Sequence, residues 1–163
     1  MSALPVRAPA VKTYPNEKAE IQGVAEWLTK QVKAGVQPHE CRLFVRSTAE
    51  IERAKDVAVA AKLPFKILDE HVETVSGQLS ICTMHLAKGL EFRAVAVMAC
   101  DDEILPLQER IESVADDSDL KEVYDTERQL LYVACTRARD SLLVTGVEPA
   151  SEFLDNLSSA STR

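Results

Sequence analysis

The sequence predicts an α/β domain with a mainly parallel β-sheet flanked by helices. Amphipathic helical segments alternate with short apolar strands along the chain, which is typical of parallel sheets. The run from Ala94 to Cys100 is apolar at every position, as in strands covered on both faces. No internal repeat or glycine-rich linker divides the 163 residues, so we expect one domain over residues 16–158. We expect residues 1–15 to be an extended, flexible lead-in and residues 159–163 a frayed tail.

The first predicted helix covers residues 16–34, where apolar residues recur at helical spacing. Asn16 can cap its start, and Gly35 supplies its stop. Further strands are predicted at three short apolar runs, Phe65–Leu68, Leu79–Thr83 and Ala94–Cys100.

A cation and a helix cap stand where the predicted strand Arg42–Arg46 ends. Ser47 and Glu50 form a capping box for a second helix, which ends at Leu63-Pro64. Because ligands gather beyond the carboxyl ends of strands in open α/β sheets, Arg46 and Ser47 suit a phosphate, including one of a nucleic-acid backbone. A surface arginine followed by an ordinary helix cap explains the same pattern.

The segment TMHLAKGLEF, which starts at Thr83, concentrates functional groups between two predicted strands. The residues concerned are Thr83, His85, Lys88, Gly89 and Glu91. A hydroxyl, an imidazole and an ammonium group together suit a phosphodiester, and a carboxylate suits a ribose hydroxyl. Single residues of these types are more often structural, but their density here favours a binding site.

The last predicted helix runs from Glu127 to Arg139, with a capping box of Thr126 and Gln129, before a final strand at Ser141–Thr145. On a helical projection Arg137 falls at the margin of the buried arc. Burying a guanidinium without a partner is costly, so Arg137 should meet an anion. A phosphate of ATP and an internal carboxylate are both open as that partner.

Composition excludes few classes of protein. The net charge is −7, but residues 101–127 carry eleven acidic and two basic residues, so the rest of the chain sums to +2 and a DNA-binding surface is possible there. The carboxylates at 101–103 resemble a Mg²⁺-binding Walker B strand end, but without a phosphate loop we expect them to be solvated. The acidic segment itself is expected to be a solvated loop, helical in part. Cysteines without paired spacing and apolar runs too short to cross a bilayer predict a cytoplasmic protein with reduced thiols.

At these residues the sequence resembles a known family. TMHLAKGLEF looks like motif V, and ERQLLYVACTRAR looks like motif VI, of the UvrD/Rep-like superfamily I DNA helicases. LFVRSTAEI resembles the segment that precedes motif V, so that the resemblance spans roughly residues 40–147. It implies a RecA-like (P-loop NTPase-type) three-layer domain that lacks the P-loop itself.

The resemblance also implies roles for individual residues. Arg137 matches the arginine finger that reaches the γ-phosphate of ATP, and Glu91 matches the glutamate near the ribose. The residues implied to face single-stranded DNA are Arg46, Ser47, Thr83, His85 and Lys88. Gly89 belongs to the nucleotide-binding loop, and no residue of the chain is expected to ligate a metal.

Three features depart from the family pattern. No Gly-x-x-x-x-Gly-Lys-Ser/Thr phosphate loop occurs, and the motif IV arginine is missing. Only about ten residues, Asp69–Gln78, stand where the family often carries a large insertion. We therefore expect the C-terminal motor domain of an ATP-dependent DNA helicase or translocase, excised from a longer protein and inactive alone.

The implied cofactor is ATP with Mg²⁺, held mainly by an N-terminal RecA-like ATPase domain in the same protein or on a separate polypeptide. The implied substrate is single-stranded DNA, with no membrane partner. A degenerate, non-catalytic module that binds DNA or protein is the alternative. The presence of both Glu91 and Arg137 argues against it, because mere docking would not need them.

Overall fold

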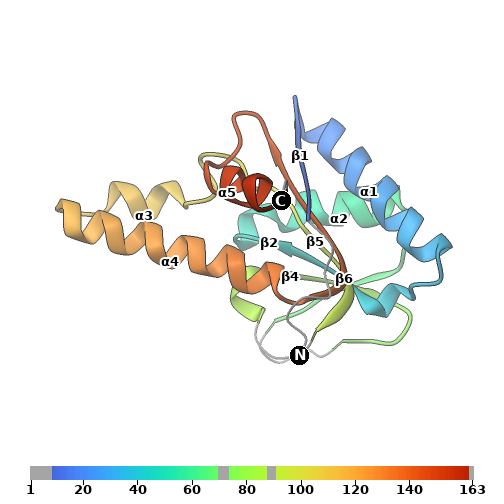
Figure 1. Ribbon diagram of the computed structural model, residues 1–163. Helices are drawn as coiled ribbons and strands as arrows, with labels where there is room; N and C mark the ends of the chain where they lie inside the picture. The colour runs from blue at the N-terminus through green and yellow to red at the C-terminus, as the bar shows by residue number, and fades with distance from the viewer. Residues whose placement is uncertain (1–8, 70–73, 88–90, 162–163) are drawn as a thin grey trace.

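The computed structural model describes residues 9–69, 74–87 and 91–161, and within them the centre is a six-stranded, all-parallel sheet (Figure 1). The strands lie in the order β1-β6-β5-β2-β4-β3. Their bounds are β1 Ala10–Tyr14, β2 Cys41–Val45, β3 Phe65–Ile67, β4 Leu79–Thr83, β5 Phe92–Val97 and β6 Ala138–Val147. The predicted α/β fold with a parallel sheet is confirmed.

Helices cover both faces of this sheet, which gives three layers (Figure 1). Helices α1 and α2 pack on one face, and α4 and α5 pack on the other. The helices are α1 Glu17–Lys33, α2 Ile51–Ala60, α3 Gln108–Glu112, α4 Asp117–Cys135 and α5 Phe153–Ser161. Between these elements the described residues also form three single 3₁₀ turns, η1 Pro38–Glu40, η2 Thr48–Glu50 and η3 Met84–Leu86.

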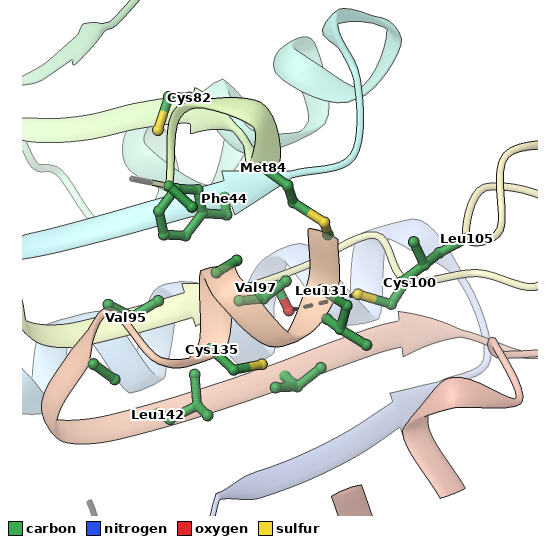
Figure 2. Packing of buried hydrophobic residues seen from close by; sticks show 14 of the residues in the cluster. Phe44, Cys82, Met84, Val95, Val97, Cys100, Leu105, Leu131, Cys135 and Leu142 are labelled. Carbon is green, nitrogen blue, oxygen red and sulfur yellow. Dashed lines mark hydrogen bonds between the residues drawn. The ribbon is translucent and has the colours of Figure 1, made fainter. Parts of the chain in front are cut away.

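Alternation along the central strands supplies both layers of the core. Leu43 of β2 packs toward α1 and α2, whereas its neighbour Phe44 packs toward α4. Figure 2 shows Phe44 and Val97 in one cluster with Leu131 and Cys135 of α4. All of these strand side chains are fully buried, and burying each large apolar side chain contributes about 1.5–3 kcal/mol.

The predicted first helix has the predicted ends. The side chain of Asn16 accepts a hydrogen bond from the backbone N–H of Ala19 at 2.8 Å. Gly35 has a φ of 106°, in the left-handed region, and the N–H of Val36 returns to the carbonyl of Gln31 at 3.1 Å. The helix therefore starts and stops where the sequence placed its caps.

The domain begins earlier than expected and ends later. Residues 10–14, expected in a flexible lead-in, form the edge strand β1, which pairs with β6 from Ala10↔Leu143 to Tyr14↔Val147. The short, proline-flanked segment carries no strong strand pattern, and β6 supplies the hydrogen-bond partners that order it. Helix α5 likewise continues past residue 158 to Ser161.

The acidic segment, residues 101–127, is helical in part, as predicted, and its helical part is longer than the sequence indicated because α3 and the first half of α4 lie within it. Helix α4 begins at Asp117, where Asp116 caps the N–H of Asp119 at 2.9 Å, and carboxylates in a first helical turn are favoured by the helix dipole. Thr126 lies inside α4 and donates to the carbonyl of Glu122, so the predicted capping box there is wrong. The helix ends at Cys135, which leaves residues 136 and 137 in a turn before β6.

Candidate functional site

The candidate residues lie at two opposite edges of the sheet. Arg46 and Thr83 stand at the carboxyl ends of β2 and β4, whereas Glu91 and Arg137 directly precede β5 and β6. Because all strands are parallel, five-residue strands separate the two edges by roughly 16 Å. Ligands of open α/β sheets gather at the carboxyl edge, where Arg46 and Thr83 lie, but Glu91 and Arg137 lie at the amino edge.

The amino edge joins motif V to motif VI through the backbone. Phe92 pairs with Ala138, and the N–H of Phe92 donates to the carbonyl of Arg137 at 2.8 Å. Glu91 and Arg137 are therefore neighbours across the β5–β6 ladder, although 46 positions separate them in the sequence. Glu91 is exposed and Arg137 is half-buried, which leaves a carboxylate and a guanidinium at one edge.

The turn after α4 determines how Arg137 is held. Its N–H donates to the carbonyl of Ala134 at 3.1 Å, and its Nη2 donates to the hydroxyl of Thr136 at 3.4 Å. The helical projection of the sequence does not apply to Arg137, since α4 ends at Cys135. Lys88 and Gly89, predicted members of the loop between Thr83 and Phe92, lie outside the described residues.

At the carboxyl edge, Arg46 is bound to a buried glutamate. Its Nε and Nη2 donate to the two carboxylate oxygens of Glu127 at 2.7 and 2.5 Å. The side chain of Arg46 is 4% exposed and that of Glu127 is 0% exposed. The DNA contact implied for Arg46 stays a prediction, and this burial does not favour it.

Glu127 accepts two further hydrogen bonds and joins three elements. The N–H of Leu107 donates to Oε1 at 2.9 Å, and Nη1 of Arg110 donates to Oε2 at 2.8 Å. Burial alone would raise the pKa of Glu127, but the hydrogen bonds from Arg46, Leu107 and Arg110 outweigh it and lower the pKa. Glu127 is therefore ionised at neutral pH and ties α4 to β2 and to the start of α3.

The other described residues of the carboxyl edge are more accessible. Ser47 caps η2 by accepting from the N–H of Ala49 at 3.3 Å, and its hydroxyl donates to Glu50 at 2.9 Å. Thr83 is half-buried at the start of η3, and His85 on η3 is exposed. Burial lowers the pKa of His85, and the nearby charge of Arg46 lowers it further. The imidazole is therefore mainly neutral at pH 7.

The part of the carboxyl edge beyond β5 and β6 is acidic. Among the described residues, an open cleft of about 570 Å³ there is lined by one arginine, Arg53, and by many carboxylates. The acidic residues are Glu17, Glu50, Glu52, Asp56, Asp101, Asp102, Glu103 and Glu148. The charge of this cleft is unfavourable for an anion such as a nucleic-acid backbone.

Asp101 is not the solvated carboxylate that the sequence led us to expect. It accepts two hydrogen bonds of 3.0 Å from Arg53 and one of 2.8 Å from the N–H of Val147. Arg53 also donates to Glu20, a fully buried residue of α1, at 2.8 Å. Asp102 and Glu103 are exposed, as predicted.

Comparison with known proteins identifies the family. Residues 68–148 match the family described as the UvrD-like helicase C-terminal domain. The chain carries a UvrD-like helicase C-terminal domain. Motifs V and VI, which carried the resemblance in the sequence, both fall within the matched residues.

Full-length relatives of this UvrD-like domain are much longer than the chain. It is 30% identical over 140 residues to ATP-dependent DNA helicase UvrD1 of Mycobacterium leprae, covering 82% of this chain and 17% of the relative. It is 27% identical over 154 residues to DNA helicase II of Rickettsia typhi, covering 94% of this chain and 22% of the relative. The chain therefore spans about a fifth of the length of these relatives.

A solved structure supports the same fold. The UvrD-like domain is similar, with a TM-score of 0.68 and 24% sequence identity, to the C-terminal domain of a possible DNA helicase from Lactobacillus plantarum WCFS1. The match covers 94% of this chain and 82% of that chain. The likeness therefore extends beyond the 68–148 segment to almost all of the α/β fold.

Two buried glutamates of the UvrD-like domain escaped the sequence analysis. Glu20 stands four residues before Val24 on the buried side of α1, and Glu127 stands four residues before Leu131 on the buried side of α4. A carboxylate on an apolar helical arc signals a buried cationic partner, because an unpaired buried charge is costly. That signal was present in the sequence, but the partners Arg53 and Arg46 come from distant segments.

Neither a metal-binding cluster nor a membrane-spanning helix is found within the described residues. No group of three or more His, Cys, Asp or Glu side chains there is arranged to hold a metal ion. None of the described helices combines the length and apolar character that a membrane span needs.

Proposed function

We propose that this chain is the second motor domain of an ATP-dependent DNA helicase or translocase. It works against a separate RecA-like domain, N-terminal in the same protein or on another polypeptide, that binds ATP through a phosphate loop. The observation that supports this most is the pairing of Phe92 with Ala138 within the UvrD-like segment, because it sets Glu91 beside Arg137. Such a motor acts where DNA and ATP are both present, in the cytoplasm.

The amino edge fits part of a nucleotide. The guanidinium of Arg137 suits the γ-phosphate and the carboxylate of Glu91 suits the ribose, whereas Gly89, predicted for the nucleotide-binding loop, lies outside the described residues. The sequence has no phosphate loop, and the described residues offer no metal-binding group, so the other domain holds Mg²⁺ and most of the ATP. When ATP is sandwiched between the domains, Arg137 stabilises the negative charge that develops on the transferred phosphoryl group.

The carboxyl edge beyond β2 and β4 is the proposed DNA track. Thr83 and His85 present hydroxyl and imidazole groups that suit backbone phosphates. The other predicted contacts are Lys88, which lies outside the described residues, and Ser47, whose hydroxyl donates to Glu50. The cleft on the other side of this edge is acidic and excludes a phosphate backbone. Opening and closing of the nucleotide interface at the amino edge then changes which phosphates of single-stranded DNA are bound at the carboxyl edge.

The test is the loss of ATP hydrolysis in the helicase that includes this chain when Arg137 is changed to Ala. We expect DNA-stimulated turnover to fall on the order of 10³-fold or more, with binding of single-stranded DNA retained. Arg139→Ala is the matched control, since Arg139 is 53% exposed, two residues away and paired with Asp140 at 3.6 Å. Unchanged turnover in Arg137→Ala would refute the arginine-finger role.

The isolated chain gives a second measurement. It should show no Mg²⁺-dependent ATP turnover and only weak binding of nucleotide, because it contains no phosphate loop. Measurable turnover by the purified 163-residue chain would contradict the proposal. A degenerate binding module, the competing function, predicts DNA or protein binding that is indifferent to Arg137 and Glu91.

A further inference from the structure

Two arginines share one buried carboxylate at the carboxyl edge. Arg46 and Arg110 both donate to Glu127, and within the described residues the carboxylate has no third cationic partner. The three side chains carry two positive charges and one negative charge, so one positive charge is left without a counter-charge from Glu127. Such an excess is stabilised only where solvent or an anion reaches it.

The excess charge lies on Arg110 rather than on Arg46. The side chain of Arg46 is 4% exposed and gives both Nε and Nη2 to Glu127, whereas the side chain of Arg110 is 38% exposed. Within the described part of the chain, Arg110 makes one side-chain hydrogen bond, from Nη1, so its other N–H groups face solvent. An arginine held by one nitrogen and open at the others can bind a phosphate with little loss of conformational entropy.

The surroundings favour a phosphate on the His85 side of Arg110. Helix α4, which carries Glu127, packs against η3, which carries His85. Arg46 and Arg110 both bind Glu127 on this helix, and their charges help to lower the pKa of His85, after the larger effect of burial. On the other side, a hollow of about 500 Å³ beside Ser47 is lined by three glutamates, which disfavour an anion: Glu50, Glu103 and Glu109.

We propose that Arg110 contacts a backbone phosphate of single-stranded DNA, and that Arg46 instead holds Glu127, which fixes Arg110 at the edge. This rests on the proposed function, since it adds one residue to the DNA track. The proposed phosphate contact is therefore Arg110, which lies 64 positions after Arg46, the arginine for which the sequence predicted this role. Glu127 is the residue through which the two arginines are linked.

The experiment measures binding of the 163-residue chain to a fluorescein-labelled oligo(dT) by anisotropy, over a series of salt concentrations. For single strands, each phosphate neutralised contributes about −0.7 to the slope of log K against log salt. Arg110→Gln should make this slope shallower by about 0.7 and weaken binding roughly fivefold at low salt. Arg110→Lys should keep the slope of the native chain, because it keeps the charge.

Arg128→Gln is the matched control for the loss of one positive charge. Arg128 lies on α4 beside Glu127, but it pairs with Asp125 at 3.3 Å and stacks on the ring of Phe153. Its substitution should leave the salt slope unchanged. Circular dichroism of each variant checks that the fold is retained. We expect Arg110→Gln to fold, because Glu127 still accepts hydrogen bonds from Arg46 and from the N–H of Leu107.

Each outcome decides between the two proposals. An unaltered affinity and slope in Arg110→Gln, with binding by the native chain, overturns the role of Arg110 and leaves the proposed function standing. An equal change in Arg110→Gln and Arg128→Gln overturns it as well, because it indicates unspecific charge attraction. Absence of binding by the native chain overturns both the DNA track and the role of Arg110.

Discussion

Arg46 and Glu127 are 81 positions apart and form a buried, doubly hydrogen-bonded ion pair between the end of β2 and the middle of α4. The pair lies where the candidate DNA track and the helix that leads to Arg137 meet. Breaking a buried pair leaves an uncompensated charge, which typically costs about 3–5 kcal/mol. The pair therefore holds together the elements that carry both halves of the proposed site.

Arg46→Ala should lower the free energy of unfolding by about 3 kcal/mol, at the lower end of that range because Arg110 and the N–H of Leu107 still bind Glu127. Urea denaturation followed by circular dichroism measures the change. Lys55→Ala is the control, since the Lys55–Glu52 pair lies on the surface and should contribute less than about 1 kcal/mol. Equal stability of Arg46→Ala and the native chain would show that the pair is dispensable.

The pH dependence of stability should report the same carboxylate. The pKa of Glu127 in the folded chain is lowered from its ordinary value of 4.5, so its ionised form stabilises the fold above that pH and the contribution is lost as the pH falls through the lowered pKa. The difference in unfolding free energy between the native chain and Glu127→Gln should be constant from about pH 7 to about pH 5 and shrink below that. A difference that is independent of pH down to the acid transition would contradict this account.

Thr145→Val tests the second buried carboxylate. The hydroxyl of Thr145 donates to Glu20 at 2.6 Å, and both residues are fully buried. Losing a hydrogen bond to a buried charge should cost about 1.5–3 kcal/mol. Thr13→Val removes a similar hydroxyl, which donates to Glu148 at 2.9 Å in an exposed position, and should cost less than about 0.5 kcal/mol. Thermal unfolding of the two variants side by side compares these costs.

Binding of single-stranded DNA should tighten as the pH falls from about 7.5 to about 5.5. Burial and the charges of Arg46 and Arg110 lower the pKa of His85, with Glu127 partly opposing them, so the free imidazole is mainly neutral at pH 7. A bound phosphate favours the protonated form and raises that pKa. His85→Gln should flatten the dependence in an anisotropy titration. If the pH dependence of DNA binding persisted in His85→Gln, a group other than His85 would be its cause.

The four cysteines should resist modification in the folded chain. All are free and buried, and burial raises the pKa of Cys41 and Cys82 to about 11 and that of Cys135 to about 12, while that of Cys100 is also raised. Ellman's reagent should therefore react slowly with the native chain and with four thiols after denaturation in guanidinium. Rapid reaction of a native thiol would indicate local opening of the sheet.

Some elements could be predicted because their signals are local. Asn16 and Gly35 mark the ends of α1, and the strand at Leu79–Thr83 was predicted with its observed bounds. Caps and apolar periodicity act over a few residues, so a single segment of sequence contains them. The start of α4 was missed although Leu120, Val123 and Tyr124 recur at helical spacing, because the many acidic residues around them indicated a solvated loop.

The sequence by itself determined the fold class, the family resemblance and the chemical groups at the site, since these depend on side-chain identity and short-range order. Only the tertiary structure decided where the groups stand. Parallel strands place residues before and after them at opposite edges, which separates Arg137 from His85 and joins it to Glu91. Likewise, Arg46 forms an ion pair with Glu127 because long-range packing buries both side chains together, and local sequence patterns do not reveal such packing.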